Sequence, residues 1–147
     1  MNYSIPLYKL SLIRDGSVCA ERKIVTKSDD LYPILREYYA NHDREEMLVV
    51  LLDAKHKIIG INSVSTGSLT LSIVHPRETF KAAIVSNCAA IILAHNHPSG
   101  DPAPSQEDRA LTKRLKEGGE LLGIPVLDHL VIGDGRYVSF ADQGWLA

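Results

Sequence analysis

The feature that most restricts the fold is a short apolar run that passes through two histidines into a proline-rich loop. Residues 90–94, Ala-Ile-Ile-Leu-Ala, have the length and composition of a buried strand, and they run directly into His95-Asn96-His97. The next seven residues, 98–104, contain three prolines and one glycine, which favours an irregular loop. A helix is then expected to begin at Ser105. The segment therefore predicts a buried strand, a rigid loop and a helix, in that order.

Apolar segments of strand and helix length alternate along the rest of the chain, which predicts a mixed α/β protein with a β-sheet between helices. Near the N-terminus, residues 5–13 and 18–25 flank Asp15-Gly16 and predict a β-hairpin. The other predicted strands are 47–53, 58–64, 69–74, 125–132 and 137–140, the first of them apolar enough to be central. The predicted helices are 28–41 with Ser28 as N-cap, a helix starting at Pro76, and the one after Ser105 with Leu111, Leu115 and Leu122 on its apolar side.

The size and composition indicate a soluble globular domain. The chain has 147 residues, of which 45% are hydrophobic and 23% charged, and its formal net charge is −2. This charge gives no field that would attract a nucleic-acid backbone. Two isolated cysteines, the lack of a signal-peptide pattern and the lack of a long apolar run predict a cytoplasmic protein without a membrane partner.

Two histidines at the end of a strand are suited to bind a metal ion together. Residues i and i+2 of a strand point the same way, so His95 and His97 are expected to present both imidazoles to one point. Imidazole nitrogens bind Zn²⁺, and a catalytic zinc needs three protein ligands and an open position. Asp108 is the candidate third ligand, because the loop 98–104 folds back and brings the first turn of a helix to the histidines.

A purely structural interpretation exists for each half of this segment. Ser105-Gln106-Glu107-Asp108 has the form of a capping box, which alone would explain Ser105 and Asp108. His95 and His97 would then be the polar end of a core strand. Each explanation accounts for one half only, whereas a metal site accounts for both and for the rigid loop between them.

The remaining histidines are not expected to bind the metal. His129 is expected to be a hydrogen-bonded histidine at a strand end, with a supporting role behind the metal ligands as the alternative. His75 is expected at the entry of the helix that starts at Pro76. His42 and His56 are expected in surface turns.

The spacing of the candidate ligands resembles the JAMM motif of the Jab/MPN metalloprotease fold: His95-x-His97, seven residues, Ser105, two residues, Asp108. The sequence around this motif, from about residue 44 to the end, is similar to that of bacterial RadC-like proteins of the same fold. The resemblance implies a RadC-type domain over 44–147, with a mixed sheet flanked by helices in a three-layer, cytidine-deaminase-like sandwich. Residues 1–43 would be an N-terminal hairpin and helix packed on this core. The stretches that carry the similarity are 74–78, 92–100, 127–133 and 137–141.

The resemblance also implies roles for individual residues. His95, His97 and Asp108 correspond to the zinc ligands of the family. An upstream glutamate serves as general acid and base, and it corresponds here to Glu45, with the adjacent Glu46 as the alternative because neighbours on a strand point to opposite faces. Ser105 corresponds to the residue that donates a hydrogen bond to the oxyanion.

These roles predict a zinc-dependent hydrolase that cleaves a peptide or isopeptide bond, and thus a protein or peptide as substrate. A second hypothesis is a DNA-repair or mobile-element accessory protein that binds DNA or a replication partner, with catalysis secondary or absent. Longer RadC-like proteins have a helix-hairpin-helix region suited to DNA, but residues 1–43 lack its glycine-centred hairpins. A third hypothesis is a zinc-bearing scaffold without activity.

Overall fold

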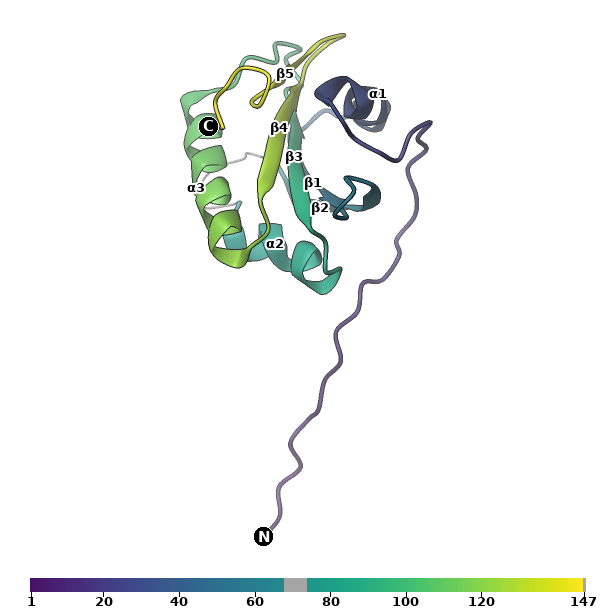
Figure 1. Ribbon diagram of the computed structural model, residues 1–147, viewed down its shortest axis with the longest axis vertical. Helices are drawn as coiled ribbons and strands as arrows, with labels where there is room; N and C mark the ends of the chain where they lie inside the picture. Colours follow the sequence, from purple (N-terminus) through teal and green to yellow (C-terminus); the bar gives the residue numbers. More distant parts are fainter. Residues whose placement is uncertain (68–73, 147) are drawn as a thin grey trace.

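A single mixed β-sheet forms the centre of the computed structural model, which describes residues 1–67 and 74–146 (Figure 1). The strand order is β2-β1-β3-β4-β5, and only the β3–β4 pair is parallel. The strand expected at 69–74 lies outside the described residues except for Val74. The five strands are β1 (Glu46–Leu52), β2 (Ile58–Thr66), β3 (Ala90–Asn96), β4 (Val126–Ile132) and β5 (Tyr137–Ser139).

Helices cover both faces of the sheet and create a three-layer structure. Helix α1 (Ser28–Tyr39) packs on one face, and α2 (Pro76–Val85) and α3 (Gln106–Leu122) pack on the other (Figure 1). All seven residues of β1 are buried, and successive side chains alternate between the two cores. This arrangement confirms the predicted mixed sheet flanked by helices.

The helix boundaries follow local capping chemistry. Pro76 is the first residue of α2, and the His75 side chain accepts a hydrogen bond from the backbone of Arg77, which confirms His75 as the entry residue. Helix α1 begins one residue earlier than predicted, because Lys27 and not Ser28 is its N-cap residue. The side chain of Asp30 accepts a hydrogen bond from the backbone N–H of Lys27 at 3.2 Å, and the Ser28 hydroxyl, inside the helix, donates to Asp142 at 2.6 Å.

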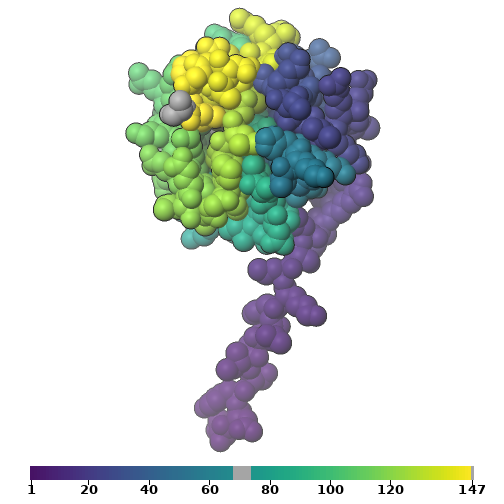
Figure 2. Space-filling view, in the orientation of Figure 1, coloured from purple at the N-terminus to yellow at the C-terminus, as the bar shows by residue number. Residues whose placement is uncertain are grey.

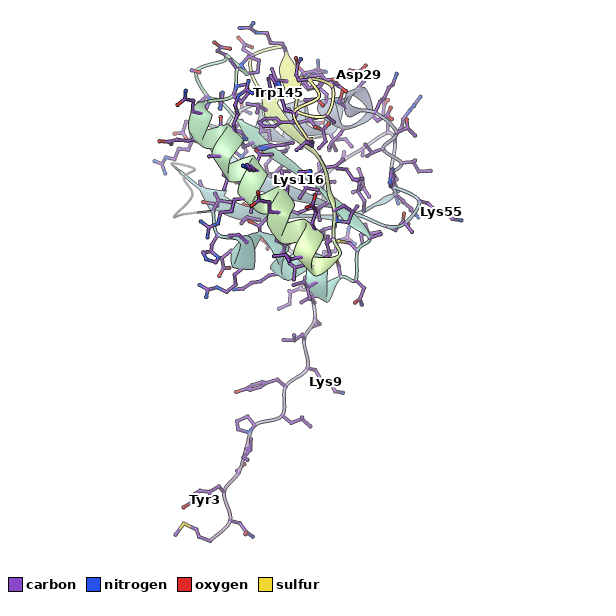
Figure 3. All side chains as sticks on the ribbon, turned by 60° about the vertical axis from the view of Figure 1, so that its left-hand side comes forward. Tyr3, Lys9, Asp29, Lys55, Lys116 and Trp145 are labelled. Atoms are coloured by element: carbon purple, nitrogen blue, oxygen red, sulfur yellow. The ribbon has the colours of Figure 1, made fainter. Side chains whose placement is uncertain are left out.

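The structure corrects two predictions of detail. The hairpin predicted over 5–13 and 18–25 is wrong: residues 5–22 are an exposed chain that leaves the body of the protein (Figures 1 and 2). The side chains of Tyr3 and Lys9 project from this chain without covering the core (Figure 3). The apolar residues of the first segment are at odd positions at its start and at even positions further on, so a strand formed by it would have no single apolar face. Isolated two-stranded hairpins are also only marginally stable in water. Leu122 is also 49% exposed and not part of the apolar side of α3.

The base of this N-terminal arm is attached to the sheet edge by one antiparallel bridge, Ile24 with Lys57. The backbone of Val25 donates to the carbonyl of His56 at 2.9 Å. Within the described residues, no helix has the length and apolar character needed to cross a membrane. Cys19 is exposed and Cys88 is buried, and both are free thiols.

Two adjacent glycines of α3 test how closely this helix packs against α2 and against the chain that follows α3. A methyl group at Gly118 would make ordinary contacts of 3.6 Å with Phe80 and 3.7 Å with Pro76, whereas one at Gly119 would overlap the carbonyl oxygen of Ile124. We expect Gly118→Ala to raise the free energy of unfolding by about 0.5–1 kcal/mol through helix propensity. We expect Gly119→Ala to lower it by about 1–3 kcal/mol through overpacking. Urea unfolding of both variants checks this, and equal effects would contradict the packing.

Candidate metal site

Two histidine side chains meet at the end of the central strand β3. His95 is the penultimate residue of this strand and fully buried, and His97 follows the strand and is partly exposed. Their Nε2 atoms lie 3.1 Å apart. The structure thus brings both imidazoles to one point, as their spacing predicts.

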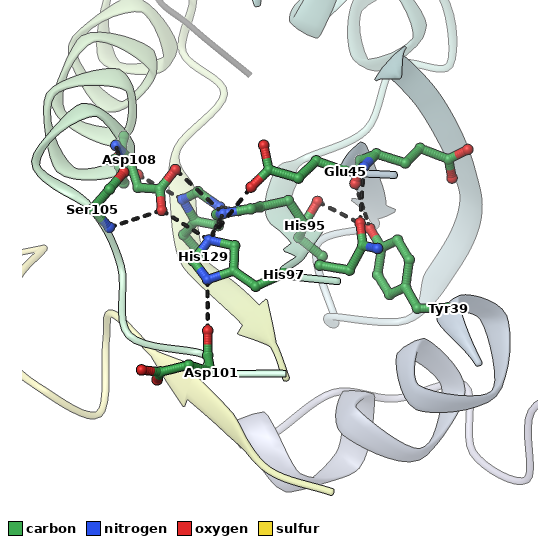
Figure 4. Close-up of polar contacts among 12 residues, drawn as sticks. Tyr39, Glu45, His95, His97, Asp101, Ser105, Asp108 and His129 are labelled. Atoms are coloured by element: carbon green, nitrogen blue, oxygen red, sulfur yellow. Dashed lines mark hydrogen bonds and ion pairs between the residues drawn. The ribbon is translucent and has the colours of Figure 1, made fainter. Parts of the chain in front are cut away.

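Asp108 reaches the same point from the first turn of α3. Its Oδ1 lies 3.3 Å from His95 Nε2, and its Oδ2 lies 3.1 Å from His97 Nε2 (Figure 4). In a tetrahedral zinc site with bonds of about 2.0–2.1 Å, two ligand atoms are separated by about 3.3–3.4 Å. Each separation lies within a few tenths of an ångström of this value, with a different oxygen of Asp108 facing each histidine, so the donor set and its spacing fit a small tetrahedral cation.

The capping box predicted as the structural alternative is also present, and it involves the same residues. Ser105 Oγ accepts a hydrogen bond from the backbone N–H of Asp108 at 3.0 Å, and the N–H of Ser105 donates to Asp108 Oδ2 at 2.9 Å. This pair of bonds fixes the rotamer of Asp108, which is 4% exposed. The cap and the approach to the histidines are therefore compatible, because the cap orients the carboxylate toward them.

The hydrogen bonds behind the histidines indicate which ring nitrogen carries the proton. His97 Nδ1 lies 2.8 Å from the carbonyl oxygen of Asp101. Since a carbonyl oxygen only accepts hydrogen bonds, Nδ1 carries the hydrogen, and Nε2 of a neutral ring presents a lone pair to the site. His95 Nδ1 lies 2.7 Å from Nε2 of the buried His129. His129, expected as a hydrogen-bonded histidine at a strand end with a supporting role behind the metal ligands as the alternative, lies in the middle of β4 and directly behind His95.

Glu45 completes the site on its open side. Its Oε1 lies 3.7 Å from His97 Nε2, and ligand atoms of Glu45, His95 and His97 all lie within 4.8 Å of one another. The side chain of Glu46 points to the other face of the sheet, where its carboxylate accepts a hydrogen bond from Tyr38. Of the two glutamates considered from the sequence, only Glu45 is therefore next to the histidines.

Asn96 fixes the backbone on both sides of Glu45, a role that sequence reasoning missed. Its side chain points away from the histidine face, as strand alternation requires, and is buried. Asn96 Oδ1 accepts from the N–H of Glu46 at 2.8 Å, and Nδ2 donates to the carbonyl of Arg44 at 2.9 Å. The hydroxyl of Tyr39 lies 2.9 Å from the carbonyl of Glu46, so a second polar side chain holds the start of β1 (Figure 4).

The electrostatics of the site favour an anionic aspartate beside basic imidazoles. Burial opposes ionisation of Asp108, but hydrogen bonds with His95 and His97 outweigh it and hold the pKa of this carboxyl well below its usual range. The hydrogen bond with Asp108 raises the pKa of His97, although burial acts against it. Burial lowers the pKa of His129 well below its usual value, so this ring is neutral.

The remaining histidines lie away from the site, as expected. His75 caps α2, and His42 packs against the ring of Tyr38 with their centroids 5.0 Å apart. His56 has a φ of 60°, a left-handed conformation in the turn between β1 and β2. The sequence pattern therefore distinguished the two histidines of the site from His42, His56 and His75.

Comparison with known proteins agrees with the strand, loop and helix geometry. Residues 25–145 match the family described as RadC-like JAB domain. The chain is 48% identical over 139 residues to a UPF0758 protein of Methanococcoides burtonii, covering 95% of this chain and 59% of that protein. It is 52% identical over 129 residues to one of Caldanaerobacter subterraneus (88% and 55% covered) and 61% identical over 103 residues to one of Pelobacter propionicus (70% and 45%).

The chain thus spans about half the length of the curated relatives it matches. The matched region contains every strand and helix of the structure and all the residues of the site. A family match over most of the chain, with relatives of about 50% identity, confirms the resemblance noted from the motif. This protein belongs to the RadC-like JAB domain family.

Proposed function

We propose that this protein is a zinc-dependent hydrolase of peptide or isopeptide bonds, with His95, His97 and Asp108 as metal ligands. The observation that carries the proposal is the convergence of two imidazoles and one carboxylate: the two Nε2 atoms lie 3.1 Å apart, and each lies 3.1–3.3 Å from one oxygen of Asp108. The carboxylate of Glu45 lies on the open side. Two imidazoles and one carboxylate form a donor set that catalytic zinc sites use.

Burial and hydrogen bonding distinguish the role of Asp108 from that of Glu45. Asp108 is 4% exposed and is held by the capping box, which suits a ligand that must keep its position. Glu45 is only partly buried, and its nearest separation from His97 is 3.7 Å. A general acid–base must reach a water molecule and then a leaving group, so the freer carboxylate suits that role.

The residues around the proposed metal have separate roles in hydrolysis. A bound zinc ion would act as a Lewis acid that lowers the pKa of water and polarises a carbonyl group. Glu45 accepts a proton from the attacking water and delivers it to the leaving amine. Ser105 Oγ acts as an acceptor toward the N–H of Asp108, which leaves its hydroxyl hydrogen to donate to the developing oxyanion, a contribution of about 3 kcal/mol in comparable sites.

The access to the site supports a protein or peptide as the proposed substrate. Glu45 and His97 are partly exposed and Ser105 is exposed, so the reacting centre opens at the surface, where a chain segment of another protein can reach it. The formal net charge of −2 gives no support to the alternative of a DNA-binding accessory protein.

Exchanging one oxygen for nitrogen in each carboxylate tests the division of roles. We expect Asp108→Asn to lose bound zinc, because a neutral amide replaces an anionic ligand. We expect Glu45→Gln to keep about one zinc per chain and to lose peptide cleavage by about 10²–10⁴-fold, as removal of a general base does. Metal analysis and a peptide-library cleavage screen measure the two effects.

His97→Ala serves as the reference for loss of the site in this experiment. A folded wild-type protein that takes up no zinc would overturn the metal site. Equal cleavage by wild type and Glu45→Gln would overturn the role of Glu45, and loss of zinc from Glu45→Gln would make this glutamate a ligand.

Zinc affinity should also depend on pH in a defined direction. A proton on His97 competes with the metal, and the hydrogen bond with Asp108 raises the pKa of His97 above 6.5 in the metal-free protein. The proton is bound below this pKa and absent above it, so we expect the dissociation constant to rise about tenfold per pH unit below it and to level off above it. Competition with a chelator of known pH dependence measures this. An affinity that is constant between about pH 8 and 5.5 would contradict the assignment.

A further inference from the structure

A chain of buried hydrogen bonds extends from His95 away from the candidate metal position. His95 Nδ1 lies 2.7 Å from His129 Nε2, and His129 Nδ1 lies 2.6 Å from the hydroxyl oxygen of Thr112. The hydroxyl of Thr112 donates to the backbone carbonyl of Asp108 at 2.7 Å. The chain therefore starts at one candidate ligand and ends on the backbone of another.

The acceptor at the end of this chain fixes the position of every proton in it. A carbonyl oxygen only accepts, so Thr112 must donate its single hydrogen to Asp108 and accept from Nδ1–H of His129. His129 is 0% exposed, and a cationic ring there would carry a large desolvation cost. Its Nε2 is therefore without a proton and accepts from Nδ1–H of His95.

We propose that His129 and Thr112 are positioning residues that hold His95 in the tautomer with the hydrogen on Nδ1, leaving the Nε2 lone pair for the metal. The proposal rests on the proposed zinc site and adds to it the residues that prepare one ligand before the metal arrives. Partners of this kind behind a metal-binding histidine typically change metal affinity by 10–100-fold when they are lost.

The ring of His129 is itself held in one orientation by the C-terminal segment. Phe140 stacks on it with centroids 4.9 Å apart and an interplanar angle of 18°, and Trp145 packs edge-on against Phe140. The carboxylate of Asp128 accepts from the N–H of His129 at 2.7 Å and from Ser139 Oγ at 2.6 Å. These contacts keep the imidazole from rotating, so the direction of the proton chain depends on Thr112.

A comparison of Thr112→Val with Thr112→Ser tests the proposal. Valine has nearly the same shape but cannot accept from Nδ1–H of His129. The neutral ring then moves its proton to Nε2, and His95 must carry its own proton on the nitrogen that faces the metal. Serine keeps the acceptor. We expect the zinc dissociation constant, measured by chelator competition, to rise about 10–100-fold for Thr112→Val and to change less than about threefold for Thr112→Ser.

Nitrogen-15 NMR of the imidazoles in metal-free protein gives a second readout that needs no zinc and no activity. At pH 8, we expect His129 to be protonated on Nδ1 in the wild type and in Thr112→Ser, and on Nε2 in Thr112→Val. A purely structural role of Thr112 would lower the unfolding midpoint of the valine variant without moving this proton. A wild-type His129 protonated on Nε2, or equal zinc affinities of the two variants, would overturn the proposal.

A second pair of variants covers the case in which Thr112→Val does not fold. His129→Gln offers an amide oxygen to His95 and an amide hydrogen to Thr112, so we expect it to keep more of the zinc affinity than His129→Leu. Equal affinities of these two variants would also overturn the proposal. A wild-type protein that binds no zinc but shows the expected proton positions would overturn the proposed function and leave the proton arrangement established.

Discussion

The close approach of two imidazole nitrogens and a carboxylate is the interaction on which the rest of the site depends. Nε2 of His95 and His97 and the oxygens of Asp108 lie 3.1–3.3 Å apart, a spacing at which unshared electron pairs repel unless a proton or a cation lies among them. The fold maintains this approach from behind each group. The carbonyl of Asp101 holds His97, the capping box holds Asp108, and the buried His129 holds His95.

Because side chains alternate between the two faces of the sheet along β3, the residues of the His95-Asn96-His97 motif have two different roles. His95 and His97 share the face that carries the candidate ligands, and Asn96 between them points to the other face, where it bonds to the backbone on both sides of Glu45. The same alternation separates Glu45 from Glu46 at the start of β1. One short strand thus sets both the ligands and the segment that bears the proposed acid–base, because β1 and β3 are adjacent in the sheet.

The strand, loop and helix of the site could be predicted from local sequence patterns, whereas contacts between distant segments could not. The apolar run before His95 and the capping residues that start at Ser105 are each determined by interactions within a few residues of the chain. The proximity of His129 to His95 depends on the parallel register of β3 and β4, which no local signal specifies. The predicted N-terminal hairpin is wrong because apolar residues on either side of a turn signal do not by themselves form a stable unit. Ile5, Leu7 and Leu10 are each more than 80% exposed in this structure.

The helix that supplies Asp108 also limits how much negative charge this carboxylate offers. Its Oδ2 accepts from the N–H of Ser105 at 2.9 Å and lies at the positive end of the α3 dipole, so the anion is stabilised before any cation binds. A carboxylate that shares electron density with these backbone dipoles would donate less of it to a bound cation, and the cation would keep more of its ability to polarise a carbonyl group. A capping box, the structural alternative in the sequence, therefore contributes to the proposed chemistry: it positions the ligand and moderates its charge.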